Sequence, residues 1–243
     1  MTRMLASVAN LAEARLIARE QVDFIDLKEP ARGALGGLPP DAVHHIIATL
    51  KQDGCCSCFS ATIGDLPLLP RLVTPAVTAM ARTGVDYVKI GLFPGGDPDG
   101  VIGGLEPLMA AGTRLIAVLF GEDPLETGLI QRLDAAGFSG VMLDTRNKQR
   151  GSLTQQVSPA RLQTFMTTAR TTGLLVGLAG SLTPADLPQL LVLKPDYLGF
   201  RGALCRGART SALEPERVSR IRRIVVGEIG FADTRLEDVY RLE

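Results

Sequence analysis

The 243-residue sequence predicts an α/β fold, a single (β/α)₈ TIM barrel. Eight short apolar segments alternate with helical patterns along the chain, which is the order of elements in such a barrel. The connections are short, and neither a Ser/Pro-rich linker nor a change of composition divides the chain. No G-x-G-x-x-G follows the first apolar segment, which argues against an open sheet that binds a dinucleotide. We therefore expect one barrel domain over residues 1–243, with 226–243 as a carboxyl-terminal extension of the last helix region.

The strand candidates are short runs rich in apolar and β-branched residues, bounded by polar residues, glycine or proline. In chain order they are 4–10, 23–28, 56–63, 86–92, 114–120, 140–145, 174–180 and 196–202.

Amphipathic helical patterns lie between these strands, for example over 41–51 and 158–172. The second pattern opens with Ser158 as an N-cap and Pro159 in the first turn, both favoured there. Glycines stand where helices are expected to stop, since glycine readily adopts the conformation that ends a helix. These are Gly84, Gly112, Gly137 and Gly173.

Composition narrows the function classes. Apolar residues make up 46% of the chain and the formal net charge is zero, so neither nucleic acid nor an acidic membrane is an expected partner. No apolar run reaches the roughly 18 residues of a membrane span. The amino terminus carries charge too close to its short apolar run for a secretion signal, so a cytoplasmic location is expected.

The cysteines and histidines do not predict a metal site. Cys55, Cys56 and Cys58 are clustered, Cys205 stands alone, and the two histidines are adjacent. A structural zinc or iron–sulfur site needs four convergent ligands, which this spacing does not supply. The clustered thiols are interpreted as small core residues of a buried strand. No metal and no cofactor are expected.

Lysine is scarce in this chain, and the positions of the lysines indicate a role in an active site. Only five of the 26 basic residues are lysine, and three of them fall at strand ends: Lys28, Lys89 and Lys148. Active sites of these barrels are built at the carboxyl ends of strands, where one layer of side chains comes from alternate strands. The second, fourth and sixth strands are therefore expected to aim three amines at one centre.

Two carboxylates repeat this pattern. Asp26 shares a strand face with Lys28, and Asp144 ends the sixth strand, four residues before Lys148. A lysine attacks a carbonyl only when it is neutral, and nearby ammonium groups and burial favour the neutral form. Asp26 opposes both effects, so the net pKa shift is left open. The alternative is a set of structural ion pairs lining the top of the barrel.

The loops after the seventh and eighth strands, 177–187 and 199–209, are typical of the phosphate site of such barrels. Gly180 and Gly202 allow close approach of backbone N–H groups to an anion, Ser181 adds a hydroxyl, and Arg201 adds a cation. A purely structural role for Gly180, as part of a tight turn, stays open.

With these residues in place, the sequence resembles the (5-formylfuran-3-yl)methyl phosphate synthase family, also called 4-(hydroxymethyl)-2-furancarboxaldehyde-phosphate synthases. The matching motifs run in order along nearly the whole chain: SVANLAEA, DLKEPARGALG, SATIGDLP, DYVKIGL, MLDT, GLAGSL and PDYLGFRGALC.

The resemblance implies a lyase of methanofuran-type cofactor biosynthesis that joins two glyceraldehyde 3-phosphate molecules. One is isomerised, an aldol-type step joins them, and water and one phosphate are lost as the furan ring closes. It assigns the Schiff base to Lys28 and proton acceptance to Lys89. It also assigns functional roles to Asp26, Asp144 and Lys148. The binding partners that the resemblance implies for the protein are small phosphorylated trioses.

One segment departs from the family pattern. Lys148 is followed by Gln149, Arg150 and Gly151, where the family usually continues Asp-Gly. The loop geometry after the sixth strand is therefore open, and Arg146 or Arg150 is a candidate for the second phosphate.

Two other functions remain as alternatives. A metal-free sugar-phosphate isomerase would use Asp26 and Asp144 as acid and base, without an imine. A non-enzymatic barrel would bind a phosphorylated metabolite without turnover. A homo-oligomer is expected, of a size that the sequence does not give.

Overall fold

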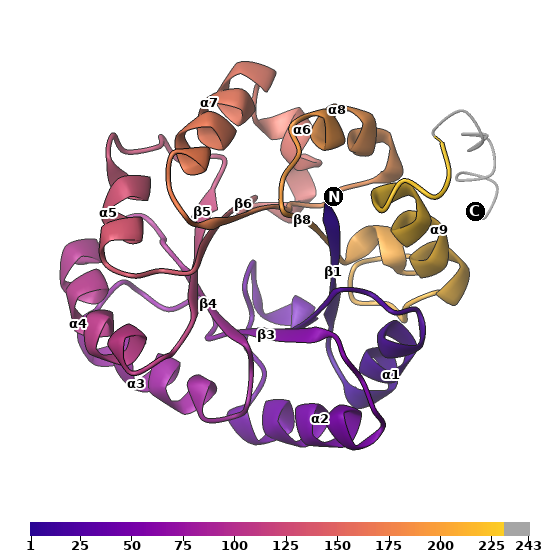
Figure 1. Ribbon diagram of the computed structural model, residues 1–243, viewed down its shortest axis with the longest axis horizontal. Helices are drawn as coiled ribbons and strands as arrows, with labels where there is room; N and C mark the ends of the chain where they lie inside the picture. The colour runs from indigo at the N-terminus through magenta and orange to yellow at the C-terminus, as the bar shows by residue number, and fades with distance from the viewer. Residues whose placement is uncertain (231–243) are drawn as a thin grey trace.

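Eight parallel strands form a closed barrel in the computed structural model of the protein, which describes residues 1–230. Each strand pairs with the next along the chain, and β8 closes the barrel against β1. The strands are β1 (Arg3–Val8), β2 (Phe24–Leu27), β3 (Cys58–Thr62), β4 (Tyr87–Gly91), β5 (Leu115–Phe120), β6 (Gly140–Asp144), β7 (Leu175–Leu178) and β8 (Tyr197–Phe200). Figure 1 looks down this barrel. The predicted fold class is confirmed.

A ring of helices surrounds the strands (Figure 1). The helices are α1 (Leu11–Arg19), α2 (Pro40–Gln52), α3 (Pro70–Ala81), α4 (Pro98–Ala110), α5 (Leu129–Ala135), α6 (Leu153–Gln156), α7 (Pro159–Arg170), α8 (Leu187–Val192) and α9 (Pro215–Val225). Several begin with proline, whose fixed φ suits the first helical position and whose missing N–H costs nothing there. Ser158 caps α7 as predicted, accepting a hydrogen bond from Arg161 N.

The predicted strands lie in the right places but run past the observed ends. The interpretation of the clustered cysteines is wrong: only Cys58 belongs to β3, where it is half-buried, while Cys56 is exposed ahead of the strand. The four cysteines are free. The carboxyl-terminal extension was predicted over 226–243; α9 ends at Val225, and residues 231–243 lie outside the described part of the chain.

Short 3₁₀ turns follow several strands on the side where the polar side chains gather. They are η1 (Pro30–Arg32), η2 (Lys148–Arg150), η3 (Pro184–Asp186) and η4 (Gly202–Leu204).

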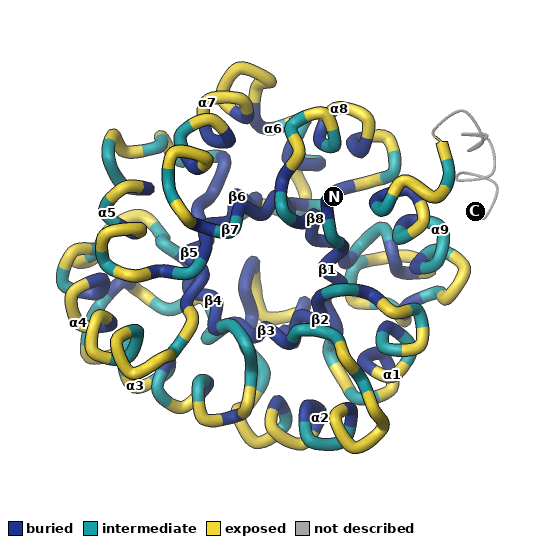
Figure 2. Tube along the Cα trace, in the orientation of Figure 1, coloured by how far each residue is buried: buried dark blue, intermediate teal, exposed yellow. Residues whose placement is uncertain are grey.

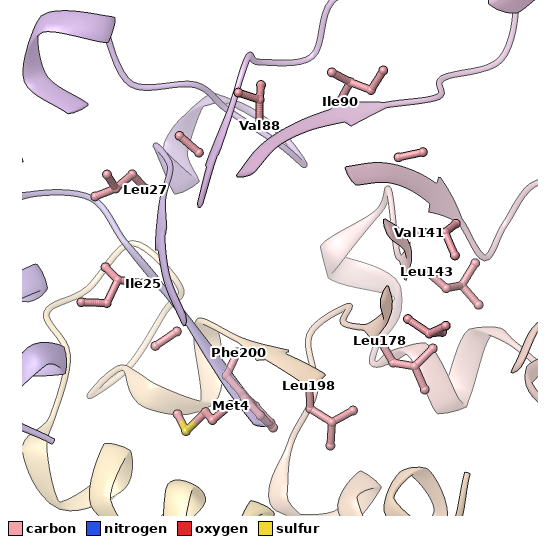
Figure 3. Close-up of a cluster of buried hydrophobic side chains, with 14 of the residues drawn as sticks. Met4, Ile25, Leu27, Val88, Ile90, Val141, Leu143, Leu178, Leu198 and Phe200 are labelled. Carbon is pink, nitrogen blue, oxygen red and sulfur yellow. The ribbon is translucent and has the colours of Figure 1, made fainter. Parts of the chain in front are cut away.

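Alternate side chains of each strand enter two separate apolar clusters. On β2, Ile25 and Leu27 pack in the large cluster between strands and helices, shown in Figure 3, while Phe24 belongs to a smaller cluster. Because successive side chains point to opposite faces, the smaller cluster fills the barrel interior. Figure 2 shows the strands almost wholly buried and exposure concentrated on the outer helices and loops. Asp26 shares the inner face with Phe24, which places a carboxylate inside the barrel.

Candidate functional site

A cavity of about 300 Å³ opens inside the barrel beyond the carboxyl ends of the strands. Its volume lies at the lower end of the range for small-molecule sites. The residues that the sequence assigned to catalysis and to the phosphate site of the β7 and β8 loops all line this one cavity, whereas Arg146 and Arg150, the candidates for a second phosphate, do not. The assigned residues that line it are Asp26, Lys28, Lys89, Asp144, Lys148, Gly180, Ser181, Arg201 and Gly202.

Asp26 and Lys89 form a buried ion pair on the cavity floor. Lys89 Nζ lies 2.6 Å from Asp26 Oδ1, and the exposed fractions of the two side chains are 2% and 0%. Ser7 and Ser60, on the flanking strands, donate hydrogen bonds of 2.9 and 2.7 Å to the same carboxylate. Burial by itself would raise the pKa of Asp26, but the charges of Lys89 and Lys28 and these hydrogen bonds hold it below its usual value. Asp26 is therefore an ionised, fully hydrogen-bonded group.

A second pair joins Asp144, the last residue of β6, to the loop that follows. Lys148 Nζ donates a short hydrogen bond to Asp144, and Thr145 N donates to the same oxygen at 2.7 Å. Burial opposes the charge of Asp144, yet the neighbouring Lys148 and Lys28 keep its pKa below the usual value. The sequence placed these two residues near one another, and the structure brings them into contact.

Lys28 differs from both of these lysines. It directly follows β2, has 7% of the residue's surface exposed, and makes no ion pair with any carboxylate of residues 1–230. Burial lowers the pKa of its amine from 10.5 to about 8, against the opposing charges of Asp26 and Asp144. About one amine in ten is then neutral at pH 7, compared with roughly one in 2,500 for an ordinary lysine. Lys28 is thus a buried amine with a lowered pKa and no ion-pair partner among residues 1–230.

The loops after β7 and β8 offer unused backbone donors to an anion. Within residues 1–230, the backbone N–H groups of Gly180, Ser181, Gly202 and Ala203 donate no hydrogen bond. Gly180 has φ of 115° and Ser181 has φ of 47°, a conformation that non-glycine residues seldom adopt. We call these four residues the N–H cradle. Unpaired N–H groups that line a cavity suit a phosphate.

Arg201, which the sequence predicts to contact phosphate, directs its guanidinium donors to protein acceptors. Its guanidinium makes a two-pronged contact with Glu13 of α1, at 2.5 and 3.0 Å. The remaining donors reach the carbonyl oxygens of Ser7, Arg209 and Ser211. An arginine has five N–H donors, and here the protein uses all of them. Arg201 therefore shapes the β8 loop and leaves no N–H for a ligand.

Arg209 is the cavity residue that sequence reasoning missed. It lies in the segment 199–209 that was predicted to bind phosphate, nine residues beyond the end of β8, and it lines the cavity. Its Nη1 and Nη2 both lie 3.4 Å from Gly33 O, across the mouth of the barrel. Nothing in the spacing of the loop distinguishes Arg209 from the exposed Arg206.

Comparison with known protein families shows which family the chain belongs to. A family model described as 4-HFC-P synthase matches residues 4–222. The chain belongs to the 4-HFC-P synthase family. Its members include an Archaeoglobus fulgidus protein named (5-formylfuran-3-yl)methyl phosphate synthase, 30% identical over 93% of this chain and 100% of its own. A Methylorubrum extorquens protein, which carries that name provisionally, is 43% identical over 90% of this chain and 89% of its own. The resemblance inferred from the motifs is confirmed, and with it an enzyme family.

Solved structures with the same fold are more distant from this 4-HFC-P synthase family member in sequence. Phosphoribosyl anthranilate isomerase from Thermus thermophilus is 16% identical, with a TM-score of 0.64 over 94% of this chain and 100% of its own. A 3-hexulose-6-phosphate synthase is also 16% identical, with a TM-score of 0.60 over 90% of this chain and 99% of its own. At this identity the likeness supports the barrel fold alone.

Two further features concern the described residues only. Their His, Cys, Asp and Glu side chains form no group of three that could hold a metal ion. None of the helices between residues 1 and 230 has both the length and the apolar composition needed to cross a membrane.

Proposed function

We propose that the protein is a (5-formylfuran-3-yl)methyl phosphate synthase, a lyase that condenses two molecules of glyceraldehyde 3-phosphate for methanofuran-type cofactor biosynthesis. The names of its relatives support the product. The observation that carries the chemistry is Lys28, a buried amine with a pKa of about 8 and no carboxylate partner in residues 1–230. Such an amine suits a Schiff-base nucleophile at neutral pH.

The atoms of this reaction balance without an oxidant or a reductant. Two trioses, each C₃H₇O₆P, lose one phosphoric acid and two waters to leave C₆H₇O₆P, the furfural phosphate. Each loss is an elimination, and one new carbon–carbon bond joins the two halves. The enzyme must therefore acidify a carbon next to a carbonyl and move protons, which an imine and nearby acid–base groups do.

Lys28 attacks a triose carbonyl and, with loss of water, forms an imine that acts as an electron sink. Loss of a proton from the adjacent carbon gives an enamine, whose carbon attacks the aldehyde of the second triose. Lys148, paired with Asp144 at the cavity wall, supplies the proton for the departing water. Lys89, held by Asp26, gives its proton to the departing phosphate and, once neutral, accepts a proton from carbon during the later loss of water. The N–H cradle holds one phosphate so that the carbonyl faces Lys28.

The carboxylate isomerase alternative receives less support. Asp26 and Asp144 each contact a lysine, and their pKa values lie below the usual value. A carboxylate of lowered pKa is a weaker general base, because proton-transfer efficiency follows basicity. This arrangement favours positioning of the lysines over direct proton abstraction by the carboxylates.

Borohydride trapping tests the imine directly. We expect sodium borohydride and glyceraldehyde 3-phosphate together to inactivate the protein and to leave a reduced triose on the peptide that contains Lys28. Lys51, on the outer helix α2, is the matched control lysine and stays unmodified. Turnover to the furan product without any adduct on Lys28 would remove the imine from the mechanism, and binding without turnover would support a non-enzymatic barrel.

A further inference from the structure

Most positive charge in the cavity is cancelled by a carboxylate. Three cations are paired in this way: Lys89 with Asp26, Lys148 with Asp144 and Arg201 with Glu13. Arg209 lines the same cavity and makes no ion pair within residues 1–230. It carries the permanent charge that is left to meet an anion, since the amine of Lys28 is needed in its neutral form.

Arg209 is fixed at its backbone and loosely held at its tip. Its carbonyl oxygen accepts a 2.8 Å hydrogen bond from Arg201 Nε, which anchors the loop. Its guanidinium contacts Gly33 O only at 3.4 Å, longer than a good N–H···O bond. Gly33 itself precedes two backbone N–H groups, of Ala34 and Leu35, that donate to Asp65. The guanidinium thus spans two anchored loops and can exchange a weak contact for a stronger one.

We propose that Arg209 binds the phosphate of the second triose, the one that does not form the imine, an inference that rests on the proposed two-triose reaction. Each phosphate monoester carries about −1.5 to −2 charges at pH 7, so a cavity that holds two of them needs two anion sites. The N–H cradle provides one. The planar fork of Arg209 provides the other, because guanidinium matches two phosphate oxygens at once.

The positions of the N–H cradle and of Arg209 relative to Lys28 decide which triose phosphate each of them binds. The cradle residues follow directly after β7 and β8, level with Lys28, whereas Arg209 is half-exposed at the mouth and reaches over to Gly33. A triose bound to the cradle and to Lys28 therefore lies beneath Arg209. The second triose enters above it, with its phosphate toward the solvent side.

The candidates that the sequence suggested for this role are less suitable. Arg146 makes a two-pronged contact with Asp123, at 2.8 and 3.0 Å, and so is already paired. Arg150 does not line the cavity. The second anion site is thus on the β8 loop and not in the loop after β6, where the sequence departs from the family pattern.

The test separates imine formation from turnover in Arg209→Gln. Two quantities are measured on each protein: the glyceraldehyde 3-phosphate concentration for half-maximal borohydride trapping at Lys28, and kcat/KM for furan formation. We expect trapping within about twofold of the unaltered protein and a loss of turnover of about 100-fold, the usual cost of removing one charge-stabilising donor. Arg206→Gln, an exposed arginine of the same loop, is the control and retains both quantities.

Conservative replacement and rescue distinguish phosphate binding from a structural role. Arg209→Lys retains more turnover than Arg209→Gln, and added ethylguanidinium partly restores turnover to Arg209→Gln. Equal losses in trapping and turnover would assign Arg209 to the imine-forming triose and overturn the proposal, as would full turnover in Arg209→Gln or a fall in Tm without rescue. If the proposed imine does not form at all, the unaltered protein gives no adduct with borohydride, and this result is distinct from any effect of Arg209.

Discussion

Two strands of the barrel each bring a lysine to the cavity, and the two lysines meet different surroundings. On β4, Lys89 is wholly buried against the ionised Asp26. After β2, Lys28 is nearly as buried but has no ion-pair partner among the described residues, and its pKa falls to about 8. The difference shows how one cavity gives two amines opposite surroundings: contact with a carboxylate stabilises an ammonium, and burial without that contact destabilises it.

Replacing Lys28 should break the chemistry without harming the fold. We expect Lys28→Met to lower kcat by on the order of 10⁴ or more, since loss of a covalent nucleophile is rarely compensated. Its lowered pKa means that the folded protein binds this proton less tightly than the unfolded chain does. The ammonium therefore costs stability below pH 8, and this cost disappears as the pH rises from about 8 toward 10.5.

The stability of Lys28→Met at pH 7 is accordingly expected to equal or exceed that of the unaltered protein. Loss of a cation beside Asp26 and Asp144 offsets part of the gain. Thermal unfolding, monitored by circular dichroism, measures the Tm of Lys28→Met and of the unaltered protein. A fall in Tm of several degrees would show that Lys28 is chiefly a structural ion-pair member, the alternative that the sequence left open.

Replacing Lys89 should instead damage the fold. Lys89→Met leaves Asp26 as a buried charge, and breaking a buried pair on one side costs about 3–5 kcal/mol. For a chain of this size each kcal/mol lowers Tm by about 2–4 °C. The double variant with Asp26→Asn removes both charges and is expected to recover most of the loss. Strict additivity of the two single changes in unfolding free energy would contradict the pairing.

The pH dependence offers the finest comparison of the two amines. If neutral Lys28 is the attacking species, kcat/KM rises about tenfold per pH unit below pH 8 and levels off above it. The group concerned loses a proton as the pH rises, so the activity increases with pH. A rise that continues to pH 10 would indicate an ordinary lysine and argue against the environment described for Lys28.

The sequence was sufficient for the barrel and for the strand-borne part of the site. Lys28, Asp26 and Lys89 could be placed together because strand side chains alternate with a period of two and barrel layers have a fixed geometry. Loop residues obey no such period. The contact of Arg201 with Glu13 is hidden from the sequence, because the two residues are 188 positions apart and no local pattern links them. Arg209 was passed over because only the folded loop separates it from Arg206.

The contact between Glu13 and Arg201 also bears on the order of assembly. It joins the first helix to the loop after the last strand, so it forms only when the two ends of the barrel meet. Until then the N–H cradle lacks its fixed shape, and Arg209 lacks the backbone anchor that Arg201 provides. On a nascent or truncated chain Lys28 is solvated like an ordinary lysine, so it lacks the burial that lowers its pKa in the closed barrel. Closure of the barrel between β1 and β8 is therefore the step that brings the cradle, the anchor of Arg209 and the buried amine into being together.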